Sequence, residues 1–324
     1  MPRVSVILNC YNHALYVAEA VESVLAQTFA DFELILIDNG STDDTRLILD
    51  RYDDPRIRRF YHDRNQSLST RLNEGVAQAA GEFVAILYSD DLMLPDKLER
   101  QVAIFEALPA EYGVVYCPAI GFNQFTGECW TKPSYGLSGD ILIGMFDRHF
   151  DGAVDMSSPL TRAACFRENH WHDDLFIDGE AIFFRIARDW KFHFDSQPTV
   201  KLRDHSSNLS KGLRRNVDMH LEIMQRLAED RALEPAAKTA LRRHRARYAV
   251  YSSWAYVRLG GKDRGWVRAK LGEAARSNLA TALCNWRFLG ALGLSFLPSS
   301  LSRSANRLGD RLRSSPGNRA LLEE

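Results

Sequence analysis

Two adjacent carboxylates, Asp90 and Asp91, directly follow a short apolar segment, Phe83–Tyr88. Carboxylate oxygens are hard ligands of the kind that Mg²⁺ and Mn²⁺ prefer, and a protein-bound ion of this type is often shared with phosphate groups. The pair therefore predicts a site for Mn²⁺ or Mg²⁺ beside a phosphorylated ligand.

Two further polar groups end apolar segments that lie earlier in the chain. Asn9 and Tyr11 follow the first segment, and Asp38 and Asn39 end the second. An aromatic ring can stack on a flat base, and a carboxylate or an amide can bond a base edge or a ribose hydroxyl. One such group is ordinary turn chemistry. Three in succession favour a single crevice that binds a nucleotide.

The first hundred residues alternate between strand and helix patterns. Strands are expected at Val4–Cys10, Phe32–Asp38, Ile57–Tyr61 and Phe83–Tyr88, and helices at 14–27, 42–52, 69–80 and 95–108. Asp43 and Asp44 are expected in the first turn of the second helix. This alternation predicts an α/β fold with a mostly parallel sheet covered by helices on both faces. In such sheets ligands bind outside the carboxyl ends of the strands.

The pattern changes along the rest of the chain. Residues 109–165 show only short strands and turns, and a helix at 179–188 precedes strands near 192–194 and 199–202. Beyond Gly212 only helical patterns remain. We therefore expect two domains, a ligand-binding α/β domain over residues 1–211 and an all-helical C-terminal extension over residues 212–324.

The composition excludes several classes of protein. The 324 residues are 45% hydrophobic and 26% charged, as in ordinary globular proteins. No G-x-G-x-x-G follows the first strand and no P-loop is present, which argues against a dehydrogenase or a nucleotidyltransferase.

The five cysteines are scattered, which predicts reduced thiols. Without an export signal or a long apolar run, a cytoplasmic protein is expected.

Charge is divided unevenly, although the formal net charge is only -1. Residues 213–324 hold 21 Lys and Arg against 10 Asp and Glu, whereas residues 1–212 hold 20 against 32. An apolar patch at 288–298 precedes four arginines between positions 303 and 313. This region favours peripheral contact with an anionic membrane surface, and the alternatives are a packed helical hairpin, a homo-oligomer contact or a solvated tail. Nucleic acid is not an expected partner, because the sequence contains no recognisable nucleic-acid-binding motif and no aromatic residues interleaved with the basic ones for base stacking.

The three polar groups with their flanking segments resemble the inverting glycosyltransferases of family 2. The resemblance covers about residues 3–211 and is carried by VSVILNCYN, FELILIDNGSTDDT and LNEGVAQAAGEFVAILYSDDLMLPDKL. It is most similar to bacterial enzymes of polysaccharide and cell-envelope assembly, including the spore-coat SpsA type. The resemblance implies a GT-A fold, a nucleotide-sugar donor, a divalent cation and a glycan or lipid-linked acceptor.

Carried over residue by residue, the resemblance assigns roles at the donor site. Asn9 and Tyr11 would lie along the uridine. Asp38 and Asn39 stand where the family usually has two aspartates, one of which contacts the edge of the uracil base. Because Asn39 replaces the second aspartate, the identity of the base stays open. Arg71 would approach phosphate.

The metal ligands follow from the same resemblance. Asp90 and Asp91 match the acidic pair that holds ribose and metal, although Tyr88 stands where the family often has a further aspartate. Arg203-Asp204-His205 is similar to the segment that closes the family's domain, in which the histidine joins the metal or the diphosphate. His205 is therefore a candidate metal ligand.

The resemblance also implies a general base near Arg185. Residues 176–185 are similar to the family's acidic segment, but the spacing to Arg185 differs by about one residue. Asp178 and Glu180 are both candidates, with Asp178 favoured, because the reaction needs a carboxylate to take the proton of the acceptor hydroxyl. The candidate that is not the base would be an acid at a helix N-terminus.

These expectations lead to two functional hypotheses. The first is an inverting transferase that moves a sugar from a nucleotide diphosphate, with UDP as the expected nucleotide, to an acceptor hydroxyl in polysaccharide or cell-envelope synthesis. The second is a non-catalytic relative that binds nucleotide-sugar and acts as a partner or scaffold. The departures at Tyr88 and Asn39 favour this second hypothesis.

Overall fold

The computed structural model describes residues 1–149, 152–175, 178–206, 208 and 212–296. The chain divides into two compact units, residues 1–205 and residues 206–324.

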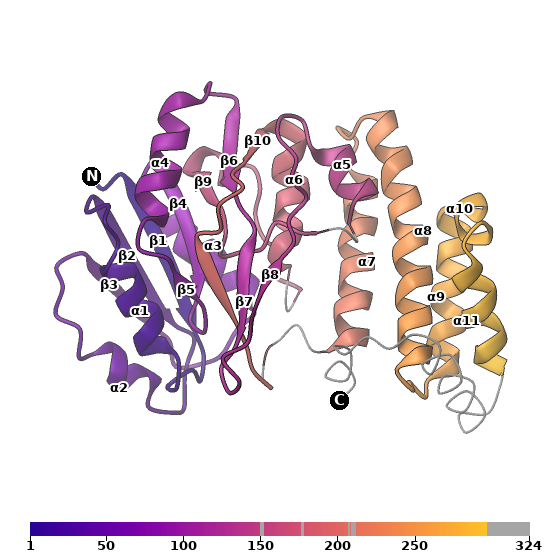
Figure 1. Ribbon diagram of the computed structural model, residues 1–324, viewed down its shortest axis with the longest axis horizontal. Helices are drawn as coiled ribbons and strands as arrows, with labels where there is room; N and C mark the ends of the chain where they lie inside the picture. The colour runs from indigo at the N-terminus through magenta and orange to yellow at the C-terminus, as the bar shows by residue number, and fades with distance from the viewer. Residues whose placement is uncertain (150–151, 176–177, 207, 209–211, 297–324) are drawn as a thin grey trace. The chain divides into compact units, whose positions relative to one another are not determined.

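A seven-stranded sheet forms the centre of the first unit (Figure 1). Its order is β10-β6-β9-β4-β1-β2-β3. The strands are β1 (Val4–Cys10), β2 (Phe32–Asp38), β3 (Ile57–Tyr61), β4 (Phe83–Tyr88), β6 (Tyr112–Tyr116), β9 (Leu160–Arg162) and β10 (Lys191–Phe194). Only β9 runs antiparallel to its neighbours, β4 and β6. The predicted α/β fold with a mostly parallel sheet is confirmed.

Helices cover both faces of this sheet. Val4, Val6 and Leu8 of β1 belong to a core that also contains the buried side chains of α1 (Val17–Leu25) and α4 (Lys97–Ala107). On the other face, α3 (Leu68–Gln78) places Gly75 so close to the sheet that an added Cβ would lie 2.6 Å from Ile7 Cγ2. A side chain at position 75 would therefore push the helix away from the strand ends.

The second predicted helix is shorter than expected. It is α2 (Thr45–Leu49), so the prediction that Asp43 and Asp44 lie in its first turn is wrong. The Asp43 carboxylate accepts hydrogen bonds from the backbone N–H of Ala14 at 3.0 Å and of Thr45 at 3.0 Å. The Asp43 carboxylate thus connects the loop after β1 to the loop after β2. These bonds outweigh the preference of an aspartate for the first turn of a helix.

A second, four-stranded sheet lies in the region where the sequence predicted only short strands and turns. Its order is β5-β11-β7-β8, with β5 (Leu92–Met93), β7 (Ala119–Asn123), β8 (Cys129–Lys132) and β11 (Val200–Asp204). β5 follows the acidic pair and β11 leads to His205. Their antiparallel pairing, Val200 with Met93 and Lys201 with Leu92, joins segments more than a hundred residues apart.

The remaining helices of the first unit are short. They are α5 (Leu142–Asp147), the 3₁₀ turns η1 (Ala163–Phe166) and η2 (Gly179–Ala181), and α6 (Ile182–Asp189). η2 and α6 together form the helix predicted at 179–188.

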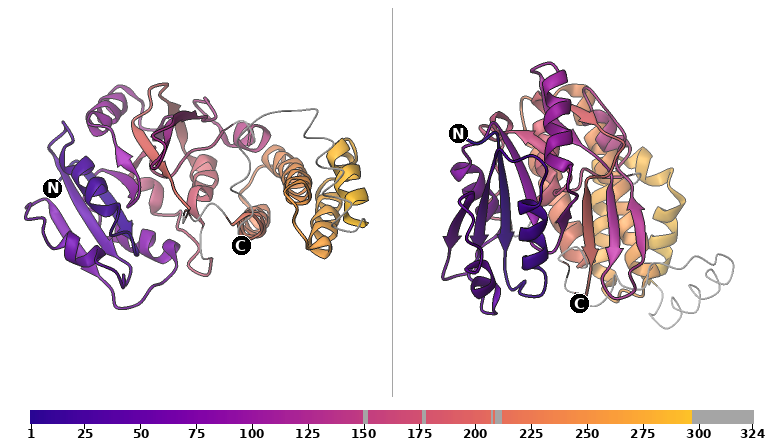
Figure 2. Two further views of the ribbon diagram at one scale, coloured as in Figure 1. Left: turned by 60° about the horizontal axis from the view of Figure 1, so that its bottom comes forward. Right: turned by 60° about the vertical axis from the view of Figure 1, so that its left-hand side comes forward.

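The second unit is helical throughout its described part. It contains α7 (Leu213–Glu229), α8 (Pro235–Arg258), α9 (Arg264–Ser277), α10 (Leu279–Leu283) and α11 (Trp286–Phe296). α8 lies between α7 on one side and α9 and α11 on the other (Figures 1 and 2). The predicted helical extension is confirmed. Among residues 1–296, outside the short gaps in the description, no helix is both long and apolar enough to span a membrane.

Candidate active site

The three predicted polar groups lie at the ends of three neighbouring parallel strands. β1 is central, and in its register Asn9 lies opposite Ile37 of β2 and Tyr88 of β4. The loop after β1 is joined directly to the loop after β4, because His13 Nδ1 lies 2.7 Å from Ser89 Oγ. The sheet therefore gathers the polar groups after β1, β2 and β4 at one edge, as the strand pattern predicted.

Asp90 is held by His205, the residue that ends the first unit. His205 Nε2 lies 3.0 Å from Asp90 Oδ2, and the buried histidine ring stacks on Tyr16 with 4.6 Å between centroids. Burial alone would raise the pKa of Asp90, but the hydrogen bond from His205 and the charge of nearby His13 lower it. The structure thus brings His205 to Asp90, and the role of this histidine as a metal ligand stays a prediction.

Asp91 has a different environment from its neighbour. Its Oδ1 accepts a hydrogen bond from the backbone N–H of Arg203 at 3.0 Å, and its Oδ2 accepts one from Ser157 Oγ at 3.0 Å. Burial, and next the negative charge of Asp90, raise the pKa of Asp91 well above its usual value. The two carboxylates therefore compete for ionisation, as like charges in one site do.

Arg203 organises the turn that carries this pair. Besides its backbone bond to Asp91, its Nε donates to the Asp90 carbonyl oxygen at 2.9 Å. The guanidinium also bonds Glu19 at 3.0 Å and lies over the Tyr16 and Phe122 rings. The closing strand β11 thus fixes the acidic turn from outside the central sheet.

Asn9 and Tyr11 offer unused contact groups beside the acidic turn. Asn9 is 8% exposed, and its Oδ1 is buried without a hydrogen-bond partner among the described residues. A buried polar atom without a partner carries a free-energy cost that a ligand donor would remove. Tyr11 is 38% exposed, so its ring is accessible for stacking.

Asp38 and Asn39 are engaged within the protein. The fully buried Asp38 carboxylate bonds Arg46 at 3.2 Å and the backbone N–H of Ser41 at 3.2 Å. The Asn39 amide makes four hydrogen bonds: it donates to Asn65 Oδ1 and the Gln66 carbonyl, and accepts from Gln66 N–H and Arg71 Nε. These bonds account for the side chain's two donor hydrogens and two acceptor positions.

Arg71 is part of the same network. It is 6% exposed and bonds Asn39 Oδ1 at 2.8 Å, Glu74 at 2.9 Å and the Arg64 carbonyl at 3.3 Å. Arg71 and Asn39 therefore hold the loop at 64–67 in place. In this structure both side chains bond protein groups of that loop and of each other.

Asp178 is paired with Arg185. The guanidinium contacts both carboxylate oxygens, at 3.3 and 2.6 Å, and the backbone N–H of His172 donates to Oδ2 at 2.9 Å. The Asp178 side chain is completely buried. Both of its oxygens are thus engaged, one turn before α6.

Glu180 faces a different group of residues. Part of the residue is exposed to solvent, but neighbouring protein atoms desolvate its carboxyl group. This desolvation, and next the negative charge of Asp155, raise the pKa of Glu180. Burial raises the pKa of Tyr88 well above its usual value, and the negative charges of Glu180, Asp91, Asp90 and Asp155 raise it further. Glu180 and the acidic pair are therefore near enough to Tyr88 to act on the same phenol, whereas the Asp178 carboxylate is engaged by Arg185 and His172.

Lys132 balances part of this negative charge. Its Nζ lies 2.9 Å from Asp155 Oδ1, and the charges of Asp155, Glu180 and Asp91 keep the pKa of Lys132 above its usual value although burial acts to lower it. Lys132 and Asp155 could not be identified from the sequence, because they lie within 109–165, where only short strands and turns were expected. His13 and Ser157 were missed as well.

The donor set beside Tyr88 fits a divalent cation. Asp90, Asp91 and His205 supply carboxylate oxygens and an imidazole, the ligands that Mn²⁺ accepts, and the carboxylates alone suit Mg²⁺. Burial is the first cause of the raised pKa of Asp91 and the negative charge of Asp90 is the next, and a bound cation would offset the second of these causes.

Similar sequences were found among curated bacterial proteins. An uncharacterized glycosyltransferase of Rickettsia typhi is 40% identical over 210 residues, which are 64% of this chain and 65% of that protein. Another, of Rickettsia felis, is 39% identical over 220 residues, which are 65% of this chain and 35% of that protein. The chain thus spans less than two thirds of the length of these relatives.

Solved structures share the fold. S. aureus TarS, residues 1–349 in complex with UDP-GlcNAc, matches with a TM-score of 0.71 at 18% identity, over 95% of this chain and 92% of that one. The mannosyltransferase PcManGT of Pyrobaculum calidifontis, in complex with GDP-Man and Mn²⁺, matches with a TM-score of 0.57 at 17% identity, over 96% and 88%. The first unit accordingly has the GT-A fold that the resemblance implied.

The family model of glycosyl transferase family 2 matches residues 5–172, which include the strand ends after β1, β2 and β4. This match covers more than half of the chain and includes the acidic turn at the carboxyl edge of the sheet. The chain belongs to glycosyl transferase family 2.

Proposed function

We propose that the protein transfers a sugar from a nucleotide diphosphate, with UDP as the nucleotide, to an acceptor hydroxyl with inversion at the anomeric carbon. One observation carries the proposal: Glu180 and the acidic pair lie near enough to the buried Tyr88 hydroxyl for their negative charges to raise its pKa together. A candidate base and a candidate phosphate site are thus neighbours, as sugar transfer requires.

The donor would lie along the carboxyl edge of the sheet. Asn9, with its unpartnered Oδ1, and the exposed ring of Tyr11 are the proposed contacts for the nucleoside. Asp38, Asn39 and Arg71 would shape this part of the site through the loops they hold, rather than by contacts of their own with the base. The UDP-GlcNAc seen with TarS supports UDP as the first nucleotide to test.

Asp90, Asp91 and His205 are the residues proposed to hold Mn²⁺ or Mg²⁺. A divalent ion there would neutralise negative charge on the departing diphosphate.

Glu180 is the general base in this proposal, in place of Asp178. The acceptor oxygen attacks the anomeric carbon from the face opposite the nucleotide, the bond from that carbon to the diphosphate oxygen breaks, and the hydroxyl proton passes to the Glu180 carboxylate. A raised pKa makes Glu180 a stronger base than an ordinary carboxylate. Asp178, bonded to Arg185, would instead position the segment that carries Glu180.

Surface contact with a membrane is a second element of the proposal. On α11, Trp286, Leu289 and Phe296 are exposed and recur on one face, while Phe288 and Ala291 are buried on the other. Together with the basic composition of residues 213–324, this stripe supports peripheral contact with an anionic bilayer and a lipid-linked or cell-envelope acceptor. The arginines between positions 303 and 313 lie outside the described residues.

A donor-hydrolysis assay tests the proposal. Release of UDP from a panel of UDP-sugars, with and without Mn²⁺, is measured for the full chain and for Glu180→Gln and Asp91→Asn. We expect metal-dependent release that Asp91→Asn abolishes. Equal release by the wild type and Asp91→Asn would support the non-catalytic alternative, and preference for a GDP-sugar would overturn UDP as the nucleotide.

A further inference from the structure

A groove of about 350 Å³ lies among α7, α8 and α9 of the helical unit. Four cationic side chains line it, and so do two carboxylates. The cations are Lys238, Arg242, Arg245 and Arg276, and the carboxylates are Glu229 and Glu273. The volume is in the range of roughly 300–1,000 Å³ that small-ligand sites occupy.

The carboxylates do not neutralise the groove. Glu273 bonds Arg245 at 3.4 Å and Lys270 at 3.1 Å, and Glu229 accepts a hydrogen bond from Gln225 at 2.7 Å. Over the described part of the chain, no carboxylate pairs with Lys238, Arg242 or Arg276. The groove therefore presents a net positive surface, whose cations belong to α8 and α9.

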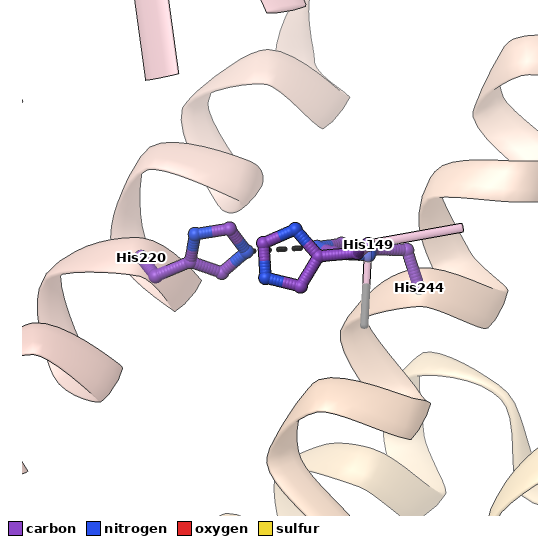
Figure 3. A group of neighbouring side chains, drawn as sticks. All are labelled: His149, His220 and His244. Atoms are coloured by element: carbon purple, nitrogen blue, oxygen red, sulfur yellow. Dashed lines mark hydrogen bonds between the residues drawn. The ribbon is translucent and has the colours of Figure 1, made fainter. Parts of the chain in front are cut away.

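The walls of the groove are fixed to one another. His220 of α7 and His244 of α8 share a hydrogen bond of 2.7 Å between their Nε2 atoms (Figure 3). The Arg245–Glu273 pair links α8 to α9. Arg245, only 13% exposed, also has a buried Nε that finds no hydrogen-bond acceptor among the described residues. A site with fixed walls loses little entropy when it binds a ligand.

We propose that this groove binds a phosphate group. The exposed guanidinium groups of Arg242 and Arg276 supply the planar, charged donors that suit tetrahedral oxyanions, and Lys238 adds a third cation. Arg245, which also lines the groove, keeps one further N–H donor, Nε, without a partner among the described residues. The phosphate is either that of a soluble molecule or that of a lipid headgroup. This site is formed entirely by the helical unit, so it is independent of the proposed donor site.

Titration calorimetry of the full chain with inorganic pyrophosphate tests the proposal. The buffer contains EDTA, so that a metal-dependent donor site contributes nothing. We expect Arg242→Gln/Arg276→Gln to weaken binding by about tenfold or more, because each arginine provides charge-assisted bonds. The control Arg231→Gln/Lys262→Gln removes the same charge outside the groove and should bind like the wild type.

Sedimentation with vesicles distinguishes the two sources of phosphate. Phosphatidylglycerol vesicles are compared with phosphatidylcholine vesicles for the same three proteins. Binding to phosphatidylglycerol that only the groove variant loses, without binding of pyrophosphate, would assign a headgroup. Binding to neither ligand, or equal loss in the control variant, would overturn the proposal. Donor hydrolysis should be unchanged in the groove variant, so failure of the proposed transferase activity would not affect this test.

Discussion

Arg185 contacts both carboxylate oxygens of Asp178, with its Nη1 3.3 Å from Oδ1 and its Nη2 2.6 Å from Oδ2. Asp178 lies one turn before α6 and two residues before Glu180, and Arg185 belongs to α6. This ion pair distinguishes two carboxylates that the sequence left as alternatives: Asp178 is bonded to Arg185, whereas desolvation, and next the negative charge of Asp155, raise the pKa of Glu180.

Substitutions at these two positions should have different consequences. Glu180→Gln should lower kcat for sugar transfer by about 10²–10⁴-fold, the usual contribution of a general base, and leave the free energy of unfolding nearly unchanged. Asp178→Asn should cost about 3 kcal/mol of stability, because it leaves a buried guanidinium without its charged partner. Transfer kinetics and urea denaturation of both variants check this. Full activity in Glu180→Gln would exclude it as the base.

The charges around Glu180 should set the acidic limb of the pH–rate profile. Asp155 raises the pKa of Glu180 and Lys132 lowers it. A base must be ionised, so Asp155→Asn should move the fall in kcat/KM to lower pH, and Lys132→Met should move it to higher pH. Profiles between pH 4 and 9 give the measurement. Shifts in the same direction for both variants would contradict this assignment.

Asn39 should matter for stability more than its neighbours. Asn39→Ala removes four hydrogen bonds and leaves buried partners such as Arg71 Nε unpaired, so we expect a loss of about 3 kcal/mol. Asn65→Ala is the matched control, because it removes only one bond of this network from an exposed position. Chemical denaturation should rank the two in that order, and equal losses would argue against Asn39 as the organiser of the loop.

Lys97 should make the free energy of unfolding depend on pH in the alkaline range. Its Nζ is buried against Gln101 and the Ser158 carbonyl, and burial lowers the pKa of Lys97 from 10.5 to about 8. Between these values the unfolded chain holds a proton that the native protein has lost, so stability rises with pH by up to about 3 kcal/mol. This gain should vanish in Lys97→Met.

Urea unfolding at pH 7, 8, 9 and 10 measures the effect as the difference between the wild type and the variant. The exposed Lys262→Met serves as the control and should follow the wild type throughout. A constant difference between the wild type and Lys97→Met across this range would show that Lys97 has the same proton affinity in both states.

The first hundred residues were predictable because buried parallel strands appear as uninterrupted apolar segments. The four strands from β1 to β4 have the bounds that the pattern predicted. In contrast, β5, β8 and β9 contain between two and four residues each, too few for a period to be visible. The small sheet and the contacts of Lys132 and Asp155 were therefore hidden.

The candidate site was predictable in its location and less so in its contacts. Strand ends identified Asn9, Asp38 and the acidic pair, because parallel strands share a carboxyl edge. The saturation of the Asn39 amide depends on the loop at 64–67, whose conformation no local pattern specifies. The choice between Asp178 and Glu180 likewise depends on the direction in which each side chain points.

The pairing of β5 with β11 has a consequence for synthesis of the protein. Asp91 leaves the ribosome more than a hundred residues before Arg203 and His205, an interval on the order of ten seconds at ordinary elongation rates. Throughout that interval the nascent chain carries the two carboxylates without Arg203 and His205, which bond them in the folded protein. The set of residues proposed to hold the cation is thus completed only near the end of the first unit, and a chain truncated before β11 would contain the strand ends after β1, β2 and β4 without Arg203 and His205.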